Sequence, residues 1–363
     1  MKPVLWGYYG VNYGDNMMLE TLLSYLEKLK GDVLLIDLFS RGRLAKKYSI
    51  FEKIKVIDVY SYSKLEKGKL ILKLSSKKYI NIWGGGTIFT DEDGDGNFGY
   101  FSKIKLLGGN IAYLGIGIGH LSKTKRVIKT KWLLKLSNLV TFRDQSSLKR
   151  ADLLVGKRNC FYKVEDLVYL YIYRELTRKK NFEKEKNKYT LITWRNLNNY
   201  ISYNDESKLM DIVVDCLLKA NLVDKVILCA LDINHDIESC KLLSNKFKKV
   251  GINVIEDFNN SIDHITHLIQ YANFHISGRL HGSMVSEISK TRTISLNYSP
   301  KMDYFYKNIG SSSYVSIYDP DFYRKILAKI NNLQSVSIEL GKRAEAALMN
   351  FEYLAKYLDS TVQ

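Results

Sequence analysis

The chain has 363 residues, of which 46% are hydrophobic and only 3 are proline, and this composition excludes a collagen-like or largely disordered protein. The length exceeds what one ordinary hydrophobic core supports, so we expect two domains. With 55 basic and 38 acidic residues the formal net charge is +17, which favours anionic small molecules, nucleic acid or an anionic membrane surface as partners. Because the sequence carries no zinc-finger or RNP-type motif, we expect no nucleic-acid partner.

Localisation is predicted from the N-terminus, the apolar runs and the cysteines. The opening MKPVLWGYYG has the pattern of a strand and a glycine turn rather than of a signal peptide, and no apolar run is long enough to cross a bilayer. The 4 cysteines are scattered without a C-x-x-C pair, which is typical of reduced core thiols. We therefore expect a cytoplasmic protein, attached peripherally to the inner face of the membrane by its charge, with no metal and no cofactor.

The first half alternates strands and helices. The first strand leads through GYYGVNYGD into a helix over residues 16–30, and further strands are predicted over 33–38, 55–60, 79–83, 110–118 and 138–142. A glycine-rich turn between a first strand and a first helix is the anion-binding position of doubly wound folds. The turn is not G-x-G-x-x-G, so we predict no dinucleotide site.

The turns that follow these strands carry candidate acceptor-binding residues. Asn12 and Asp15 are of the type that hydrogen-bonds a polyol, although Asp15 at a helix start is equally typical of an N-cap. Gly85 and Gly86 lie at the end of a strand, where glycine lets a ligand or another segment approach the backbone closely, and Asp91 follows.

The glycines of GIGIG, residues 115–119, alternate at another strand end. Without side chains at alternate positions, this strand end would leave its backbone bare on one side. We interpret these glycines as a second bare wall for a ligand.

The second half repeats the α/β pattern after a charged, apolar-poor run over residues 174–188, where we place the connection between domains. We predict a first Rossmann-like domain over 1–174, a second over 175–335, and a C-terminal helix over 336–363 that packs back across both domains. Strands are predicted over 189–194, 225–230, 253–255, 272–276 and 293–296, and helices over 205–220, 233–248, 262–271 and 283–289.

Basic side chains follow three strands of this second half. Arg195 comes after one strand, Arg279 and His281 after another, and Lys301 after a third. In an open α/β sheet, ligands bind at the carboxyl ends of the strands. Arginine offers a planar fork for carboxylate or phosphate, lysine a point charge, and histidine a proton near neutral pH. The sequence therefore predicts an anionic ligand at this edge.

Several segments together resemble the polysaccharide pyruvyl transferase family. They are GYYGVNYGD, WGGGTIFTD, GIGIG, RDQSS, Arg195, SGRLH and NYSPK, and they span residues 7–301. The resemblance implies two Rossmann-like α/β/α domains facing a cleft, as in GT-B glycosyltransferases. It also implies transfer of the pyruvyl group of phosphoenolpyruvate to two hydroxyls of one sugar, which gives a cyclic ketal and phosphate.

The resemblance also carries residue roles. The donor-binding arginine, leucine and histidine of the family fall on Arg279, Leu280 and His281, and a further donor arginine falls on Arg195. The sequence departs from the family at Glu165-Asp166-Leu167, where relatives often carry Asp-Pro, so no catalytic role is assigned to these acids.

Chemistry adds candidates for the remaining roles. Because phosphoenolpyruvate carries a carboxylate and a phosphate, several fixed cations are needed, and Lys301 joins Arg195 and Arg279. His281 is the candidate general acid for the enol methylene, and Asp15 or Asp91 of the first domain is the candidate base. The first domain is thus expected on the acceptor-sugar side and the second on the phosphoenolpyruvate side.

The acceptor is expected to be a sugar of a surface glycan, such as a capsule or exopolysaccharide precursor, linked to a polyprenyl diphosphate. Two other functions stay open. One is a GT-B glycosyltransferase with a nucleotide-sugar donor, which a glutamate placed for the ribose would favour; Glu287 is the nearby candidate. The other is a non-enzymatic protein that binds glycan or nucleic acid through its basic surface.

Overall fold

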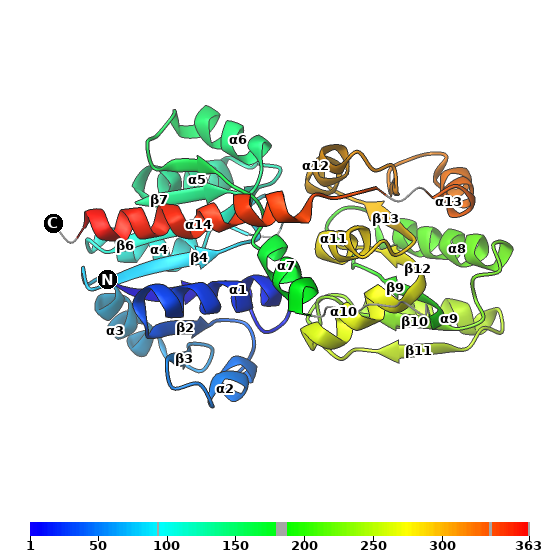
Figure 1. Ribbon diagram of the computed structural model, residues 1–363, viewed down its shortest axis with the longest axis horizontal. Helices are drawn as coiled ribbons and strands as arrows, with labels where there is room; N and C mark the ends of the chain where they lie inside the picture. Colours follow the sequence, from blue (N-terminus) through cyan, green and yellow to red (C-terminus); the bar gives the residue numbers. More distant parts are fainter. Residues whose placement is uncertain (93, 179–186, 334–335, 362–363) are drawn as a thin grey trace. The chain divides into compact units, whose positions relative to one another are not determined.

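The computed structural model describes residues 1–92, 94–178, 187–333 and 336–361. The chain forms two compact units, and both are drawn in Figure 1. The first unit comprises Met1–Gly10, Asp15–Arg178 and Leu340–Gln363, and the second comprises Val11–Gly14 and Lys179–Glu339. Of the predicted connection at 174–188, residues up to 178 end a helix and residues 187–188 begin a strand, while residues 179–186 lie outside the described part.

The first unit is built on a parallel sheet with the strand order β3-β2-β1-β4-β6-β7-β8, and β5 pairs with β6 beside this path. Its strands are β1 (Lys2–Trp6), β2 (Val33–Asp37), β3 (Ile54–Asp58), β4 (Tyr79–Gly84), β5 (Thr87–Phe89), β6 (Asn110–Ile118), β7 (Leu139–Phe142) and β8 (Phe161–Lys163). Its helices are α1 (Tyr13–Lys30), α2 (Arg43–Tyr48), α3 (Lys64–Leu74), α4 (Phe98–Leu106), α5 (Thr124–Leu136), α6 (Gln145–Val155), α7 (Val168–Arg178) and α14 (Leu340–Ser360).

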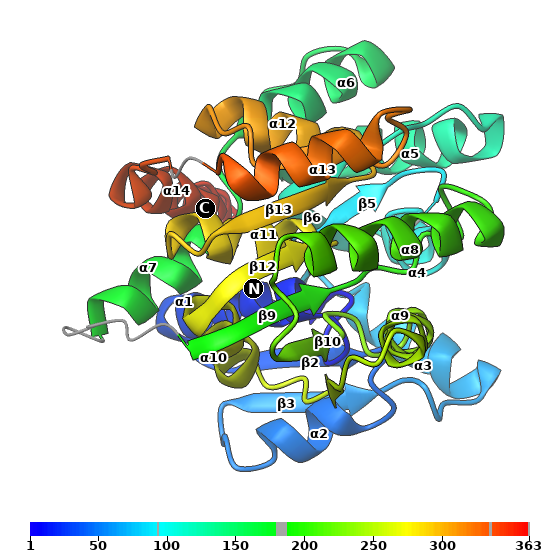
Figure 2. The same ribbon diagram turned by 90° about the vertical axis from the view of Figure 1, so that its right-hand side faces the viewer.

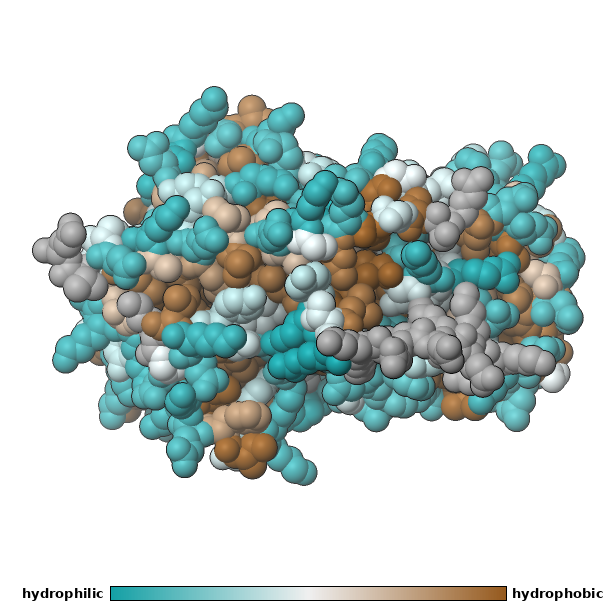
Figure 3. Space-filling model, viewed as in Figure 1, coloured by the Kyte–Doolittle hydropathy of each residue, from teal (hydrophilic) through white to brown (hydrophobic). Residues whose placement is uncertain are grey.

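Helices cover both faces of this sheet. Figures 1 and 2 show α1, α7 and α14 on one face and α3, α4, α5 and α6 in a row on the other. Because both faces are covered, the strands are nearly continuous apolar runs, and every residue of β6 is buried. In Figure 3, which looks onto the α1 and α14 side, hydrophilic side chains surround patches of apolar ones.

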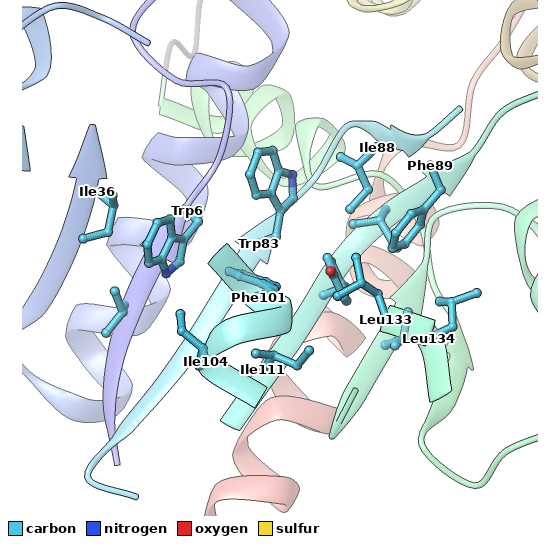
Figure 4. Close-up of a cluster of buried hydrophobic side chains, with 14 of the residues drawn as sticks. Trp6, Ile36, Trp83, Ile88, Phe89, Phe101, Ile104, Ile111, Leu133 and Leu134 are labelled. Carbon is cyan, nitrogen blue, oxygen red and sulfur yellow. The ribbon is translucent and has the colours of Figure 1, made fainter. Parts of the chain in front are cut away.

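A large core cluster lies between the sheet and the row α3–α6. Figure 4 shows Trp6 and Ile36 of the sheet together with Phe101 of α4 and Leu133 of α5 in this cluster. The aromatic rings pack edge-on or tilted, with the Trp6 and Phe101 centroids 5.8 Å apart. The inner faces of these four helices therefore supply the helix side of this cluster.

The second unit is also a parallel sheet, with the strand order β11-β10-β9-β12-β13-β14. Its strands are β9 (Asn187–Thr193), β10 (Val226–Cys229), β11 (Val254–Asp257), β12 (Ala272–Ser277), β13 (Thr293–Asn297) and β14 (Tyr314–Ser316). Its helices are α8 (Tyr203–Lys219), α9 (Ile237–Lys249), α10 (Ile262–Tyr271), α11 (Leu280–Ile288), α12 (Pro300–Ile309) and α13 (Phe322–Asn331).

The strand orders confirm the predicted fold of two Rossmann-like α/β/α units. Each sheet starts in the middle, runs to one edge, returns, and continues to the other edge, which is the doubly wound arrangement. In the second unit the direction reverses between β9 and β12, and loops that leave these two strands diverge to open a crevice in such folds.

The C-terminal helix α14 packs within the first unit. It contacts α7, β6 and β7, and the rings of Tyr162 and Tyr353 stack at 3.8 Å. Asn350 is fully buried and donates a hydrogen bond to the Glu165 carbonyl oxygen. The prediction placed this helix across both domains, whereas these contacts all belong to one. No helix in the described ranges combines the length and the apolar character needed to cross a membrane.

Candidate functional site

Three basic side chains start from adjacent strands of the second unit. Arg195 lies two residues after β9, Arg279 two residues after β12, and Lys301 in the first turn of the helix after β13. Since β9, β12 and β13 are neighbours in a parallel sheet, their carboxyl ends lie at one edge. This edge includes the switch point between β9 and β12. It is the sheet edge at which the sequence predicts an anionic ligand.

The ring of Tyr298 lies beside two of these cations, Arg195 and Lys301. The Arg195 guanidinium carbon lies 4.5 Å from the ring centroid, and its Nη1 donates a hydrogen bond of 3.0 Å to the Tyr298 hydroxyl. The Lys301 ammonium lies 5.4 Å from the same centroid. Sequence reasoning named the NYSPK segment but not Tyr298 as the common partner.

Gly278 lets the turn that leads to Arg279 pass close to the backbone at Arg195. A β-carbon at position 278 would lie 2.6 Å from the Arg195 backbone nitrogen and 2.7 Å from the Thr193 carbonyl oxygen. Only glycine lets the turn after β12 pass that close to the end of β9. The glycine of SGRLH thus serves the approach of two backbone segments.

Arg279 is held by two buried carboxylates. Its Nε and Nη2 donate hydrogen bonds to both oxygens of Asp236, at 2.5 and 2.7 Å, and Nη2 lies 3.4 Å from Asp232. Burial alone would lower the pKa of Arg279, and the carboxylates of Asp236 and Asp232 raise it above its usual range. Within the described part of the chain Nη1 makes no hydrogen bond, so that edge of the guanidinium remains for an anion.

Asp236 also fixes the surrounding loops. It is fully buried, and its two oxygens accept hydrogen bonds from the backbone nitrogens of Asn196 and Asp232. One carboxylate therefore ties the loop after β9, the loop after β10 and Arg279 to each other. Sequence reasoning missed it, although two acids four residues apart after a predicted strand were a usable signal.

Leu280 and His281 open helix α11, which starts at Leu280 rather than at Ser283 as predicted. Arg279 has the extended backbone of an N-cap and Leu280 is buried. The His281 ring lies against Gly14, because a β-carbon there would overlap with Nδ1 of His281. Gly14, the last glycine of the segment GYYGVNYGD, thus makes room for the imidazole, and Asp15 is the next residue along the chain.

Asn12 lies in the second unit, although the sequence placed it in the first domain. It forms an antiparallel bridge with Asp232, its side-chain nitrogen lies 3.4 Å from an Asp232 oxygen, and its side-chain oxygen accepts a hydrogen bond from the Gly14 nitrogen. These contacts give Asn12 a structural role in the Asp232–Arg279 network. Its predicted binding of the acceptor stays a prediction.

Gly85 and Gly86 serve packing within the first unit. Both have positive φ, and a β-carbon on Gly85 would overlap with the Met18 sulfur of α1. A β-carbon on Gly86 would lie 3.4 Å from an Asp15 carboxylate oxygen. The structure thus brings together Asp15 and Gly86, both predicted as acceptor-binding residues, while the glycines themselves are explained by the closeness of α1 to the strand end.

The Asp91 carboxylate accepts hydrogen bonds from the loop after β6. It accepts hydrogen bonds from the Ser122 nitrogen and hydroxyl, both at 2.7 Å, and from the Lys123 nitrogen at 3.1 Å. Burial opposes its ionisation, and the Ser122 and Lys123 hydrogen bonds outweigh it, so that the pKa of Asp91 is lowered. A carboxylate that is already saturated and weakly basic is a poor general base, which leaves Asp15 as the stronger candidate.

The predicted glycine wall of GIGIG is filled by side chains. A β-carbon on Gly117 would lie 3.2 Å from Arg143 Nε, and one on Gly119 would lie 2.9 Å from Thr90. Arg143 in turn forms a buried ion pair of 2.8 Å with Asp166. The interpretation of a bare ligand wall was therefore wrong, because sequence alone does not tell whether a ligand or a side chain occupies the space beside a glycine.

The sequence matches the polysaccharide pyruvyl transferase family over residues 12–300. The chain belongs to this family. No curated protein matches it in sequence. Family membership confirms the resemblance on which Arg195, Arg279, Leu280 and His281 were assigned, and it makes the protein a transferase acting on polysaccharide. The roles of the individual residues stay predictions.

Solved structures with a similar fold are UDP-N-acetylglucosamine 2-epimerases. The enzyme from Rickettsia bellii has a TM-score of 0.68 at 12% identity, over 100% of this chain and 99% of the epimerase. The enzyme from Methanocaldococcus jannaschii has a TM-score of 0.67 at 12% identity, over 98% and 100%. The Neisseria meningitidis enzyme bound to UDP-GlcNAc has a TM-score of 0.68 at 12% identity, also over 98% and 100%. At this identity the likeness shows the GT-B-like fold alone.

The acids that depart from the family pattern have structural partners. Asp166 pairs with Arg143 and accepts a hydrogen bond from the Val168 nitrogen. Glu165 lies 2.9 Å from Lys163 and 3.4 Å from Arg343 of α14. These ion pairs hold the segment after β8 against the end of β7 and against α14, which agrees with leaving both acids out of the catalytic assignment.

Glu287 is not placed for a nucleotide ribose. It lies in the last turn of α11, is 6% exposed, and accepts a hydrogen bond of 3.2 Å from the Ser311 hydroxyl. A ribose-binding glutamate must reach the ligand with its carboxylate, and this one is directed into the protein. The feature that would have favoured a nucleotide-sugar donor is thus missing at this residue.

Proposed function

We propose that this protein transfers the pyruvyl group of phosphoenolpyruvate onto two hydroxyls of a sugar in a surface-glycan precursor, with release of phosphate. The observation that carries the proposal is that Arg195, Arg279 and Lys301 follow adjacent strands at one sheet edge, where Arg195 and Lys301 both lie against the Tyr298 ring. A small ligand with both a carboxylate and a phosphate needs several fixed cations in one place. Membership of the pyruvyl transferase family supports the same donor.

In this proposal His281 is the general acid. Its proton goes to the methylene carbon of phosphoenolpyruvate, the double bond is lost, and positive charge develops at the carbon that bears the phosphate. One sugar hydroxyl bonds to that carbon and gives its proton to a base, for which Asp15 is the candidate. The second hydroxyl then forms the other carbon–oxygen bond and gives its proton to the departing phosphate, which leaves with the electrons of the broken carbon–oxygen bond.

The electrostatic layout supports this order of events. Arg279 keeps its charge because Asp236 and Asp232 compensate it, so the guanidinium is oriented before the substrate arrives. The start of α11 adds the partial positive charge of a helix N-terminus beside Arg279. These fixed charges would stabilise the leaving phosphate without rearrangement.

The test is phosphate release from phosphoenolpyruvate with a panel of polyprenyl-linked and synthetic galactosides and N-acetylhexosamines. We expect phosphate release that needs both donor and acceptor, a ketal methyl signal in the product by NMR, and a loss of about 10²–10⁴-fold in His281→Ala. His264→Ala, a partly exposed histidine paired with Asp257 on the same unit, is the matched control and should keep full turnover.

The alternative donor is tested with the same protein. UDP-GlcNAc, which the Neisseria meningitidis structure contains, is the nucleotide-sugar control. We expect phosphoenolpyruvate to raise the melting temperature and UDP-GlcNAc to leave it unchanged, because only a bound ligand stabilises the folded state. Stabilisation by UDP-GlcNAc alone, with no phosphate release for any acceptor, would overturn the proposal in favour of a glycosyltransferase.

A further inference from the structure

Helices α3, α4, α5 and α6 form a continuous basic surface on the first unit. Consecutive helices of this row are in contact, and Figures 1 and 2 both show them side by side on one face of the sheet. Together they carry thirteen basic and two acidic residues, a net charge of +11. Most of the chain's excess of +17 is therefore concentrated on this face, which we call the α3–α6 face.

The outer side of each helix combines lysine with large aliphatic residues. In α3, Leu65, Lys69 and Leu72 recur at helical spacing and are all exposed, and α6 presents Lys149 and Leu153 one turn apart. The exposed aliphatic side chains of the face, with their exposed fractions, are Leu65 (69%), Leu72 (63%), Leu106 (75%), Leu107 (51%), Ile128 (60%) and Leu153 (87%).

Packing in the hydrophobic core does not account for these exposed aliphatic side chains. The inner side of the same helices already supplies the buried cluster of Figure 4, with Leu70, Ile104, Leu133 and Ala151 among its members. An amphipathic surface helix needs one apolar side, whereas each of these helices has apolar residues on its outer side as well. Exposed aliphatic residues repeated on four adjacent helices indicate an interaction surface.

The lysines of the face are available to a partner. Arg126 and Lys129 share Asp95 in ion pairs. The remaining exposed lysines of the face, namely Lys64, Lys69, Lys73, Lys103, Lys125, Lys131, Lys135 and Lys149, form no ion pair with any described residue. Lysine stems also lie along apolar surface while the ammonium groups reach a polar layer, which suits a boundary between headgroups and acyl chains.

We propose that the α3–α6 face docks on the surface of a bilayer that contains anionic lipids. Lysines beside exposed leucines match a layer of negative headgroups above an apolar interior. Single-stranded nucleic acid would require aromatic side chains for stacking, and the exposed large aromatic residues of the described chain all lie outside these four helices. A second copy of the same face would be repelled by its like charge.

The proposal goes beyond the donor chemistry and stands independently of it, because it rests on the outer sides of helices that supply none of the candidate site residues. It has one functional consequence. An enzyme held at a bilayer through its first unit would meet lipid-linked sugar acceptors at the place where they are confined.

The test is flotation of the purified protein with vesicles of phosphatidylcholine alone or of phosphatidylcholine and phosphatidylglycerol in equal parts. We expect binding only to the anionic vesicles, weakened by added salt.

In one variant, Lys69, Lys103, Lys131 and Lys149 are replaced by glutamine, and its partitioning should fall at least tenfold, because each lysine near an anionic bilayer contributes roughly fivefold. In a second, Leu72→Ser, Leu106→Ser, Ile128→Ser and Leu153→Ser should weaken binding while leaving the salt dependence.

The matched control replaces four exposed lysines of the second unit, Lys208, Lys241, Lys249 and Lys307, by glutamine, which removes the same charge from another surface. We expect this variant to bind within about twofold of the unchanged protein. Equal weakening in both lysine variants, or tighter binding to a DNA fragment than to the anionic vesicles, would overturn the proposal. Because these binding assays contain no phosphoenolpyruvate, neither outcome tests the proposed donor.

Discussion

Arg279 depends on a neighbour that the sequence did not reveal. Its guanidinium is nearly buried, and the carboxylate of Asp236, which has no exposed surface, binds it through two hydrogen bonds. Breaking a buried ion pair by neutralising one partner leaves the other charge uncompensated. We therefore expect Asp236 to act through Arg279 as a positioning residue for the proposed donor site.

Replacing Asp236 by asparagine tests this role. We expect Asp236→Asn to raise the KM for phosphoenolpyruvate at least tenfold with a smaller change in kcat, because the arginine loses its orientation while the general acid is untouched. We also expect the free energy of unfolding to fall by about 3 kcal/mol. Steady-state kinetics and urea titrations measure the two effects.

Asp211→Asn is the matched control, since Asp211 is an exposed aspartate of the same unit that pairs with Lys246. An exposed ion pair contributes at most about 1 kcal/mol, so we expect no change in KM and little change in stability. If Asp236→Asn lost stability but kept the wild-type KM, Asp236 would be a structural residue only.

At the scale of elements, α11 joins the candidate site to the core. Arg279 is its N-cap, its first turn carries His281, and its last turn carries the buried Glu287, to which the Ser311 hydroxyl donates a hydrogen bond. Burial raises the pKa of Glu287 to about 7, and the hydrogen bonds from Ser311, Ser313 and Tyr306 oppose that rise without cancelling it. The carboxyl group that anchors this helix therefore titrates near neutral pH.

The sign of the pH dependence follows from the raised pKa. The folded protein binds the Glu287 proton more tightly than the unfolded chain, in which the pKa of this carboxyl group is 4.5. The stability that this group contributes is therefore complete below about pH 4.5 and is lost as the pH rises through about 7. The shift corresponds to roughly 3 kcal/mol at most.

We expect Glu287→Gln to remove this part of the pH dependence. Denaturant titrations at about pH 5 and about pH 8 should show a smaller loss of stability in the variant than in the unchanged protein. Glu238→Gln, an exposed glutamate of helix α9 in the same unit, should show the wild-type difference. An identical pH difference in all three proteins would rule out Glu287 as the titrating group.

Which elements were predictable follows from their length and pattern. Long apolar strands such as β6 and amphipathic helices such as α10 were predicted with the observed bounds, because buried parallel strands and helices of several turns leave clear periodicities. The three-residue strands β5 and β14 were missed, since they are too short for a pattern. Helix α12 was not predicted; Pro300 occupies its first position, where proline is tolerated.

At the scale of the whole molecule, the strand-end cations were predictable and their partners were not. A parallel sheet places all its carboxyl ends at one edge, so Arg195, Arg279 and Lys301 could be grouped from sequence alone. The pairing of Arg279 with Asp236 depends on side-chain directions in loops. Long-range contacts of this kind leave no local pattern in a single sequence.

The central claim is that one anionic ligand, phosphoenolpyruvate, binds the cations around Tyr298. The most direct measurement is a calorimetric titration of phosphoenolpyruvate into the unchanged protein and into Arg195→Gln, Lys301→Gln and Lys307→Gln. We expect the first two variants to bind at least about tenfold more weakly, because each loses a charge-assisted contact, and Lys307→Gln, exposed on the same helix as Lys301, to bind normally. Absence of binding to the unchanged protein, or equal affinity in all four, would contradict the claim.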